Sequence, residues 1–334
     1  MTVTSAQFPP PVSSTGSGCL PEVRFPVSLD QQDNVLAEII DGIEKTGVCI
    51  IRGMYTQDIV DAVTAELTPY IAGTGDYWGK TEGTAFLTAL LTKSPTYATT
   101  VLAHEIFHKV NHHFLTTRFG PCPVTTGYSV SYNCEPQLDC TNAFYIPPGG
   151  PAQLLHRDDA DHLNFQPAAS AYQQGRDTGI VFMTALTRTT RANGATRVLP
   201  GSHLWDYAQP FPAKDDPRIL DAELGPGDSL FMLTSVIHGG GTNSTAVGRF
   251  VTACFATRAH CRQLENQFLA YDPEEVKKLP PWLLRFMGYS TAKPFCGWVN
   301  KKDPLRVILG EEGMNKTEVD EKVDFVDGWP EPDL

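Results

Sequence analysis

The chain has 334 residues, of which 41% are hydrophobic and 19% charged, so it can bury a substantial core and global disorder is excluded. The net charge of −12 argues against nucleic acid as a partner, and more weakly against polyanionic substrates, which a local basic patch could still bind. No apolar run approaches the roughly 18 residues of a membrane span, and the N-terminus does not resemble a secretory signal.

Eight cysteines occur without a CxxC pair, so neither a zinc ribbon nor a thioredoxin motif is indicated. In a chain of this length they indicate reduced, mostly buried thiols, which is typical of a cytoplasmic protein. The cysteines are Cys19, Cys49, Cys122, Cys134, Cys140, Cys254, Cys261 and Cys296.

The first third of the chain is predicted to be mainly helical. Residues 1–20 are rich in Pro, Ser, Gly and Thr and are expected to form a flexible arm. VLAEIIDGIEKTG has the apolar spacing of a helix that ends at Gly47, and VCIIRG follows as a short buried strand. The runs TQDIVDAVTAELTPYI and TYATTVLAHEIFHKVNHHFL predict two further helices.

From Gly120 to about Arg258 the sequence pattern changes to short β-type runs separated by Gly, Pro and Asn. Strands at such regular spacing suggest a sandwich, jelly roll or barrel. The runs are TTGYSVSY, NAFYI, AQLLHRD, GIVFMTALT, ATRVL, DSLFML and RFVTACFA. PEEVKKLPPWLLRFMGY then predicts an interrupted helix. We therefore expect one domain over 21–334, with a helical part at 21–120, a β core at about 121–260 and a helical segment at 261–334.

Three side chains in the β region have the chemistry of a metal site. His156 and Asp158 stand two positions apart in AQLLHRDD, so on a strand they would share one face. His238 ends a later β-type run and is followed by glycines that permit a sharp turn. Two histidines and one carboxylate form the facial triad that holds Fe(II) for dioxygen chemistry. The HxD pair alone would be a weak signal.

Arg249 opens the run RFVTACFA and by alternation shares a face with Val251, Ala253 and Phe255. An arginine on an apolar inward face requires an anion, and its planar guanidinium suits a carboxylate. The alternative at this stage is an internal salt bridge.

A competing motif is His104-Glu105-Ile106-Phe107-His108, a literal HExxH on a predicted helix and thus the signature of a zinc metalloprotease. The extension that would supply a third histidine is absent, because Asn111 and Phe114 take the required glycine and histidine places. A third alternative is a non-catalytic binding protein with a degenerate site.

Several segments together resemble the phytanoyl-CoA dioxygenase-like family of Fe(II)/2-oxoglutarate oxygenases. They are GGPAQLLHRDDADH, NGATRVLPGSHLW, GPGDSLFMLTSVIHGGGTNST, the RF at Arg249 and, more loosely, MGYSTAKP. The resemblance covers roughly residues 125–300. It is closest to fungal members that act on secondary metabolites, such as verruculogen synthase-like enzymes and meroterpenoid oxygenases.

The resemblance implies a double-stranded β-helix core (jelly roll, cupin-like) and a dioxygenase that uses Fe(II), 2-oxoglutarate and O2 on a small-molecule substrate. His156, Asp158 and His238 match the iron ligands, and Arg249 matches the residue that pairs with the distal carboxylate of 2-oxoglutarate. Gln153 and Thr196 match residues that help to hold this co-substrate. Strict alternation places Gln153 opposite His156, so its role requires a bulge or strong twist near 147–150. The resemblance also implies a homodimer formed through the C-terminal segment.

Overall fold

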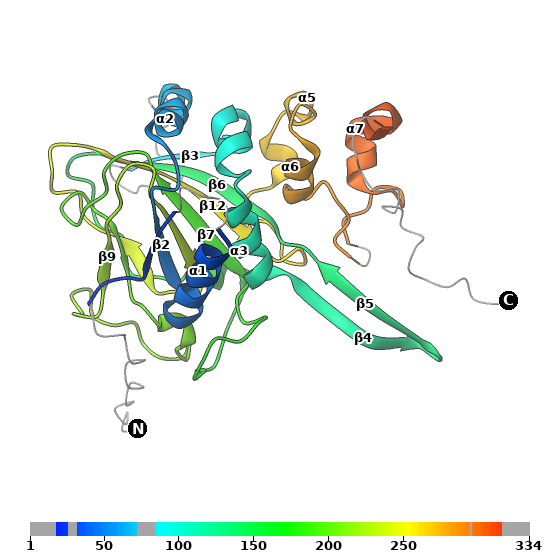
Figure 1. Ribbon diagram of the computed structural model, residues 1–334, viewed down its shortest axis with the longest axis horizontal. Coiled ribbons are helices and arrows are strands. Elements are labelled where there is room, and N and C mark those ends of the chain that lie inside the picture. Colours follow the sequence, from blue (N-terminus) through cyan, green and yellow to red (C-terminus); the bar gives the residue numbers. More distant parts are fainter. Residues whose placement is uncertain (1–17, 26–31, 72–83, 294–295, 316–334) are drawn as a thin grey trace.

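The computed structural model describes residues 18–25, 32–71, 84–293 and 296–315 (Figure 1). Most of the expected N-terminal arm and the acidic C-terminal end therefore lie outside the described residues. Within the described ranges, no helix is long and apolar enough to cross a membrane.

A seven-stranded sheet is the largest element of the fold, and its strands are antiparallel except for the first pair. In spatial order its strands are β1 (Glu22–Arg24), β2 (Val48–Arg52), β10 (Ser229–Leu233), β7 (Gly179–Ala185), β12 (Arg249–Thr257), β6 (Gln137–Ile146) and β3 (Ala85–Thr88). The central strands β7 and β10 are buried along their whole length, which explains why their sequences are continuous apolar runs.

Two smaller sheets complete the β structure. One contains β11 (His238–Gly240), β8 (Thr196–Val198) and β9 (Leu220–Ala222). The other is a hairpin of β4 (Thr117–Thr125) and β5 (Tyr128–Cys134), which projects from the body of the molecule (Figure 1). The predicted β core thus exists. Its main sheet also includes β2, the strand predicted at VCIIRG, and β1 and β3 from the part expected to be mainly helical.

Helices precede and follow this core in the sequence. Their bounds are α1 (Gln32–Thr46), α2 (Gln57–Ile71), α3 (Glu105–Leu115), α4 (Gln267–Ala270), α5 (Pro273–Val276), α6 (Pro281–Phe286) and α7 (Pro304–Asn315). The buried face of α1 carries Val35, Ile39 and Ile43, four positions apart, and packs on β2 and α3. Helix α1 ends at Thr46 and is followed by Gly47, which has a positive φ of 83° and lies so close to Val236 and His203 that a Cβ would clash.

Two predicted elements differ from the structure. The helix predicted over TYATTVLAHEIFHKVNHHFL is interrupted: a π-helical turn covers Tyr97–Val101, and α3 begins only at Glu105. His104 is extended and its Nδ1 accepts the backbone N–H of Ile106, so it caps α3 instead of continuing the earlier turn. The strand predicted over AQLLHRD is also wrong, because only His156 makes a bridge there.

Candidate metal centre

His156 and His238 face each other across a single antiparallel bridge between the 151–157 segment and β11. The backbone N–H of each donates to the carbonyl of the other, at 2.9 and 3.0 Å, and the ring centroids are 4.4 Å apart. Nδ1 of His156 lies 2.8 Å from the Leu154 carbonyl, and Nδ1 of His238 lies 3.1 Å from the Val236 carbonyl. Each Nδ1 therefore carries the proton and donates, which leaves the Nε2 lone pair free for a metal ion.

Asp158 completes the group from the first residue of a 3-10 turn (Asp158–His162). Its carboxylate oxygens lie 3.4 Å from His156 Nε2 and 3.5 Å from His238 Nε2. Oδ2 is buried and accepts no hydrogen bond from the described residues. Burial raises the pKa of Asp158, but the imidazoles of His238 and His156 outweigh it, and the net shift is downward.

The three ligand atoms lie within 4.8 Å of one another, and no other group of three such residues does so in the described part of the chain. Two neutral imidazoles and an anionic carboxylate with a free lone pair are a donor set that fits a divalent transition metal. The three residues predicted as ligands thus lie together in the structure, although the geometry is a bridge followed by a turn and not a regular strand.

Gln153 approaches the same end of β11. Its backbone N–H donates to the Gly240 carbonyl at 2.9 Å, and its side-chain Oε1 accepts the Gly240 N–H at 2.8 Å. Regular pairing from the bridge between His156 and His238 would set Leu154 opposite Gly240, so the segment is shifted by one residue. Thr196 is buried and pairs with the other side of Gly240. The irregularity lies between Gln153 and His156, and the co-substrate role of Gln153 stays a prediction.

Arg249, the first residue of β12, is only 4% exposed. Its Nε and Nη1 are buried without a hydrogen-bond partner, and burial lowers the pKa of the guanidinium to about 10. No described carboxylate pairs with Arg249, so the alternative of an internal salt bridge finds no support within the described ranges. A buried cation without a partner is costly and is stabilised by an anionic ligand.

The residues on both sides of Asp158 anchor it to the rest of the fold, a feature that sequence reasoning missed. The Arg157 guanidinium stacks 4.2 Å above the Tyr207 ring, and its Nε donates to the Ser235 carbonyl at 2.9 Å. Asp159 is fully buried and accepts hydrogen bonds from Tyr207 and Asn164, at 2.5 and 2.7 Å. The only sequence signal was the additional charge in the run HRDD.

The HExxH motif does not form a metal site. His104 uses Nδ1 as a helix cap, and Glu105 forms an exposed ion pair with Lys109 at 2.8 Å. The His108 ring packs edge-on against Trp282 at 5.2 Å and lies 6.3 Å from Phe286. These contacts explain the motif as a cap, a surface pair and a packed aromatic residue.

His203, in the run NGATRVLPGSHLW, has a structural role. It is fully buried, and its Nε2 lies 3.1 Å from the Glu44 carbonyl.

Comparisons with known proteins bear on the fold and the family. Residues 43–251 match the family description "Phytanoyl-CoA dioxygenase (PhyH)". The chain is 47% identical over 278 residues to dioxygenase cnsJ of Penicillium expansum, and the aligned part covers 83% of each chain. It is 30% identical over 312 residues to dioxygenase himG of Aspergillus japonicus, which covers 90% of this chain and 95% of that one.

Two solved structures share the architecture at a TM-score of 0.50. One is the non-heme alpha-ketoglutarate-dependent epimerase SnoN from nogalamycin biosynthesis, 17% identical over 72% of this chain and 90% of that chain. The other is HygX from Streptomyces hygroscopicus with nickel, 2-oxoglutarate and hygromycin B bound, 16% identical over 67% and 87% of the two chains.

These likenesses confirm the predicted double-stranded β-helix (jelly-roll, cupin-like) fold. Together with the matched length and the identity to cnsJ, they show that the chain belongs to the phytanoyl-CoA dioxygenase family of oxidoreductases.

Proposed function

We propose that the chain is an Fe(II)- and 2-oxoglutarate-dependent dioxygenase that oxidises a small organic metabolite in secondary-metabolite biosynthesis. The observation that carries the proposal is that two groups in this fold lack a ligand. One is a triad with free metal-binding atoms, and the other is a buried arginine without an anion among the described residues. Its relatives named dioxygenases, and the 2-oxoglutarate bound to HygX, support the assignment.

In this proposal His156, Asp158 and His238 hold the metal, and Arg249 binds the distal carboxylate of 2-oxoglutarate. Gln153 and Thr196 border the co-substrate from the two sides of Gly240. Iron, 2-oxoglutarate and dioxygen together supply a two-electron oxidation of the substrate, with succinate and CO2 as by-products.

The protein's own residues orient the reactants and exclude water. The carbonyls of Leu154 and Val236 fix the tautomer of the two histidines, so that both rings present Nε2 to the metal. The backbone N–H of Asp158 donates to the Thr234 carbonyl at 3.0 Å, which sets where the carboxylate enters the site. Hydroxylation, desaturation, rearrangement and endoperoxidation are all outcomes that this machinery supports.

The test is succinate formation from 2-oxoglutarate by metal-free protein to which components are returned one at a time, with terpenoid, alkaloid and peptide metabolites as candidate substrates. We expect succinate only when Fe(II), 2-oxoglutarate and O2 are all present, and its loss in Asp158→Asn. Glu105→Gln, on the unused HExxH motif, is the matched control that retains activity. Full substrate oxidation in the presence of a chelator, without added iron, would refute the proposal.

A further inference from the structure

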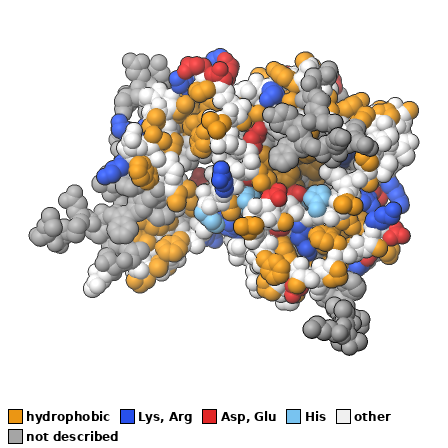
Figure 2. Space-filling view, turned by 180° about the vertical axis from the view of Figure 1, so that it is seen from behind, with side chains coloured by type: hydrophobic (Ala, Val, Ile, Leu, Met, Phe, Trp, Pro, Cys, Tyr) orange, Lys and Arg blue, Asp and Glu red, His pale blue; other side chains and the backbone are white. Residues whose placement is uncertain are grey.

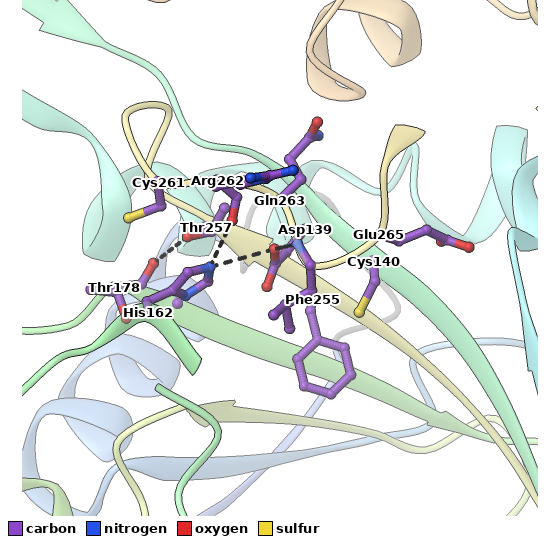
Figure 3. Close-up of polar contacts among 12 residues, drawn as sticks. Asp139, Cys140, His162, Thr178, Phe255, Thr257, Cys261, Arg262, Gln263 and Glu265 are labelled. Carbon is purple, nitrogen blue, oxygen red and sulfur yellow. Dashed lines mark hydrogen bonds and ion pairs between the residues drawn. The ribbon is translucent and has the colours of Figure 1, made fainter. Parts of the chain in front are cut away.

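His162 is a buried histidine to which the proposed function gives no role. On one face of the molecule, histidine side chains lie at the surface close to carboxylates (Figure 2). The side chain of His162 is only 8% exposed, and that of its partner Asp139 is 4% exposed. The imidazole Nε2 lies 3.7 Å from Asp139 Oδ1 and donates to the Arg262 carbonyl at 3.0 Å (Figure 3). The pair therefore joins three segments of the chain inside the protein.

His162 is the last residue of the 3-10 turn that the proposed metal ligand Asp158 begins. The first residue of the turn is held by its backbone N–H, which donates to the Thr234 carbonyl at 3.0 Å. Directly after the turn, Leu163 has a φ of +56°, a left-handed conformation that is unfavourable for a leucine. Such a conformation persists only where the surrounding structure fixes the backbone, and the contacts of His162 lie directly beside it.

Asp139 reaches this turn from an irregularity in β6. Its two neighbours on β6 pair with consecutive residues of β12, Ala256 and Phe255, so Asp139 is the extra residue of a β-bulge. Bulges re-aim single side chains and are frequent next to active sites. The Oδ1 atom that lies beside His162 also accepts the backbone N–H of Leu264 at 2.7 Å. The bulge thus places one buried carboxylate between the Asp158 turn and the chain that follows β12.

The two side chains of the pair carry opposite charges that favour each other. The Asp139 carboxylate raises the pKa of His162, although burial acts in the opposite direction, and Asp161 raises it further from within the turn. A buried ion pair often contributes little net stability, because the desolvation of both groups offsets their attraction. Stability alone is therefore a weak explanation for burying both side chains.

We propose that His162 and Asp139 are positioning residues, whose ion pair fixes the far end of the Asp158 turn on β6 and so holds the Asp158 carboxylate against the two histidines. Asp158 comes from a turn and not from a regular strand, so no strand pairing fixes it and both ends of the turn must be held. Neither positioning residue contacts the metal; both act through the turn. The inference rests on the proposed function, since it takes Asp158 as a metal ligand.

The experiment measures the affinity of metal-free protein for Ni(II) by calorimetry, with the melting temperature of the same metal-free protein alongside. Removing the imidazole frees the far end of the turn. His162→Ala is therefore expected to bind Ni(II) about tenfold more weakly, at the lower end of the loss found for residues that orient metal ligands. The amide of glutamine has two N–H donors, one for the Arg262 carbonyl and one for Asp139. His162→Gln is therefore expected to recover most of the affinity.

Asp139→Asn is a second variant that disturbs the fold less. Its side chain keeps an acceptor for the Leu264 N–H and loses only the charge, and it is expected to weaken Ni(II) binding in the same direction as His162→Ala. The visible absorption of bound Co(II), which reports the geometry of the ligands, is expected to change in both variants.

His113→Gln is the matched control. His113 also pairs with a carboxylate, that of Glu44 at 2.8 Å, but it lies on α3, which carries none of the three proposed ligands. This variant is expected to bind Ni(II) and to absorb with Co(II) as the wild type does.

Unchanged Ni(II) affinity and an unchanged Co(II) spectrum in folded His162→Ala and Asp139→Asn proteins would overturn the proposal, whatever their melting temperatures, because the pair would then be merely structural. An equal loss of affinity in His113→Gln would also overturn it, since the effect would not be specific to the turn. A wild type that does not bind Ni(II), or an Asp158→Asn variant that binds it at full affinity, would instead count against the proposed function, so the two failures are distinguishable.

Discussion

Arg249 brings a positive charge into the protein interior where no described carboxylate neutralises it. If 2-oxoglutarate supplies the missing anion, Arg249→Ala leaves the distal carboxylate desolvated and unpaired. Truncating one side of such a pair costs roughly 2–5 kcal/mol, which corresponds to about 30-fold to several-thousand-fold in affinity. We expect this loss in the apparent 2-oxoglutarate constant, with Arg249→Lys intermediate because lysine keeps the charge without the bidentate fork.

Two controls separate this role from a structural one. Because Arg249 has no partner among the described residues, Arg249→Ala is expected to melt at or above the wild-type temperature. Pyruvate lacks the distal carboxylate and is expected to discriminate less between the two proteins. An unchanged 2-oxoglutarate constant in folded Arg249→Ala protein would remove the co-substrate role.

Asp177 is a second buried ionisable group, and its effect on stability depends on pH. Burial raises the pKa of Asp177 to about 7, although the Ser235 hydroxyl donates a hydrogen bond to the carboxylate. The folded protein therefore holds a proton that the unfolded chain releases near its ordinary pKa of 3.8. Stability contributed by this group is fully present below that value and falls as pH rises toward 7.

We expect Asp177→Asn to remove this loss, so the variant gains stability relative to the wild type between pH 5 and pH 8. Melting temperatures of the two proteins across this range measure the difference. Asp216→Asn is the opposite control, because the Arg218 guanidinium lowers the pKa of Asp216 and its charge stabilises the fold at higher pH. A wild-type minus Asp177→Asn difference that does not vary with pH would contradict the assignment.

At the scale of elements, α3 shows how a motif can be present without its chemistry. Glu105 is exposed and pairs with Lys109, and no third ligand joins His104 and His108 in the described chain. We expect Glu105→Gln to leave metal content, activity and melting temperature nearly unchanged, because exposed ion pairs contribute little. Metal analysis of the purified variant checks this. Stoichiometric zinc in the wild type that disappears in His108→Ala, while iron binding stays absent, would restore the metalloprotease interpretation.

Sequence reasoning reached the site residues more reliably than their geometry. Alternation predicted that His156 and Asp158 share a strand face, whereas the chain makes one bridge at His156 and then turns at Asp158. The residue types and their flanking motifs selected three residues that do lie together, whereas local periodicity did not predict how the chain brings them there. The one-residue shift at Gln153 depends on hydrogen bonds to Gly240, a partner far away in sequence, which no local pattern encodes.

The same limit applies to the helices. Apolar spacing predicted α1 and α2 because each presents one continuous face to the core. Apolar spacing did not predict the break at His104, where the side chain accepts a hydrogen bond from the backbone and caps a new helix in place of a continuous one. The hydrogen bonds that hold the neighbour of Asp158 in place could not be predicted from the sequence either, because Tyr207 and Asn164 contact Asp159 only in the folded chain.

At the scale of the whole molecule, the residues of the proposed site come from both the seven-stranded and the three-stranded sheet. His238 belongs to β11 of the small sheet, and His156 is bridged to it, whereas Arg249 opens β12 of the large sheet. In the proposed function, a ligand held by both the metal and Arg249 would link the two sheets. The stability of the fold is therefore expected to depend on metal and co-substrate together.

Thermal melting of metal-free protein with Ni(II), with 2-oxoglutarate and with both tests this dependence. A ligand at a hundred times its dissociation constant adds about 2.7 kcal/mol of stability, which for a chain of this size is several degrees. We expect 2-oxoglutarate to raise the melting temperature strongly only when Ni(II) is present. Without the metal, Arg249 would bind only the distal carboxylate of 2-oxoglutarate, and the other end of the co-substrate would be unbound. Asp158→Asn is expected to lose both shifts, and Arg249→Ala only the 2-oxoglutarate shift. A 2-oxoglutarate shift of equal size without metal would place the co-substrate away from the triad, because a ligand that never contacts the metal cannot depend on it.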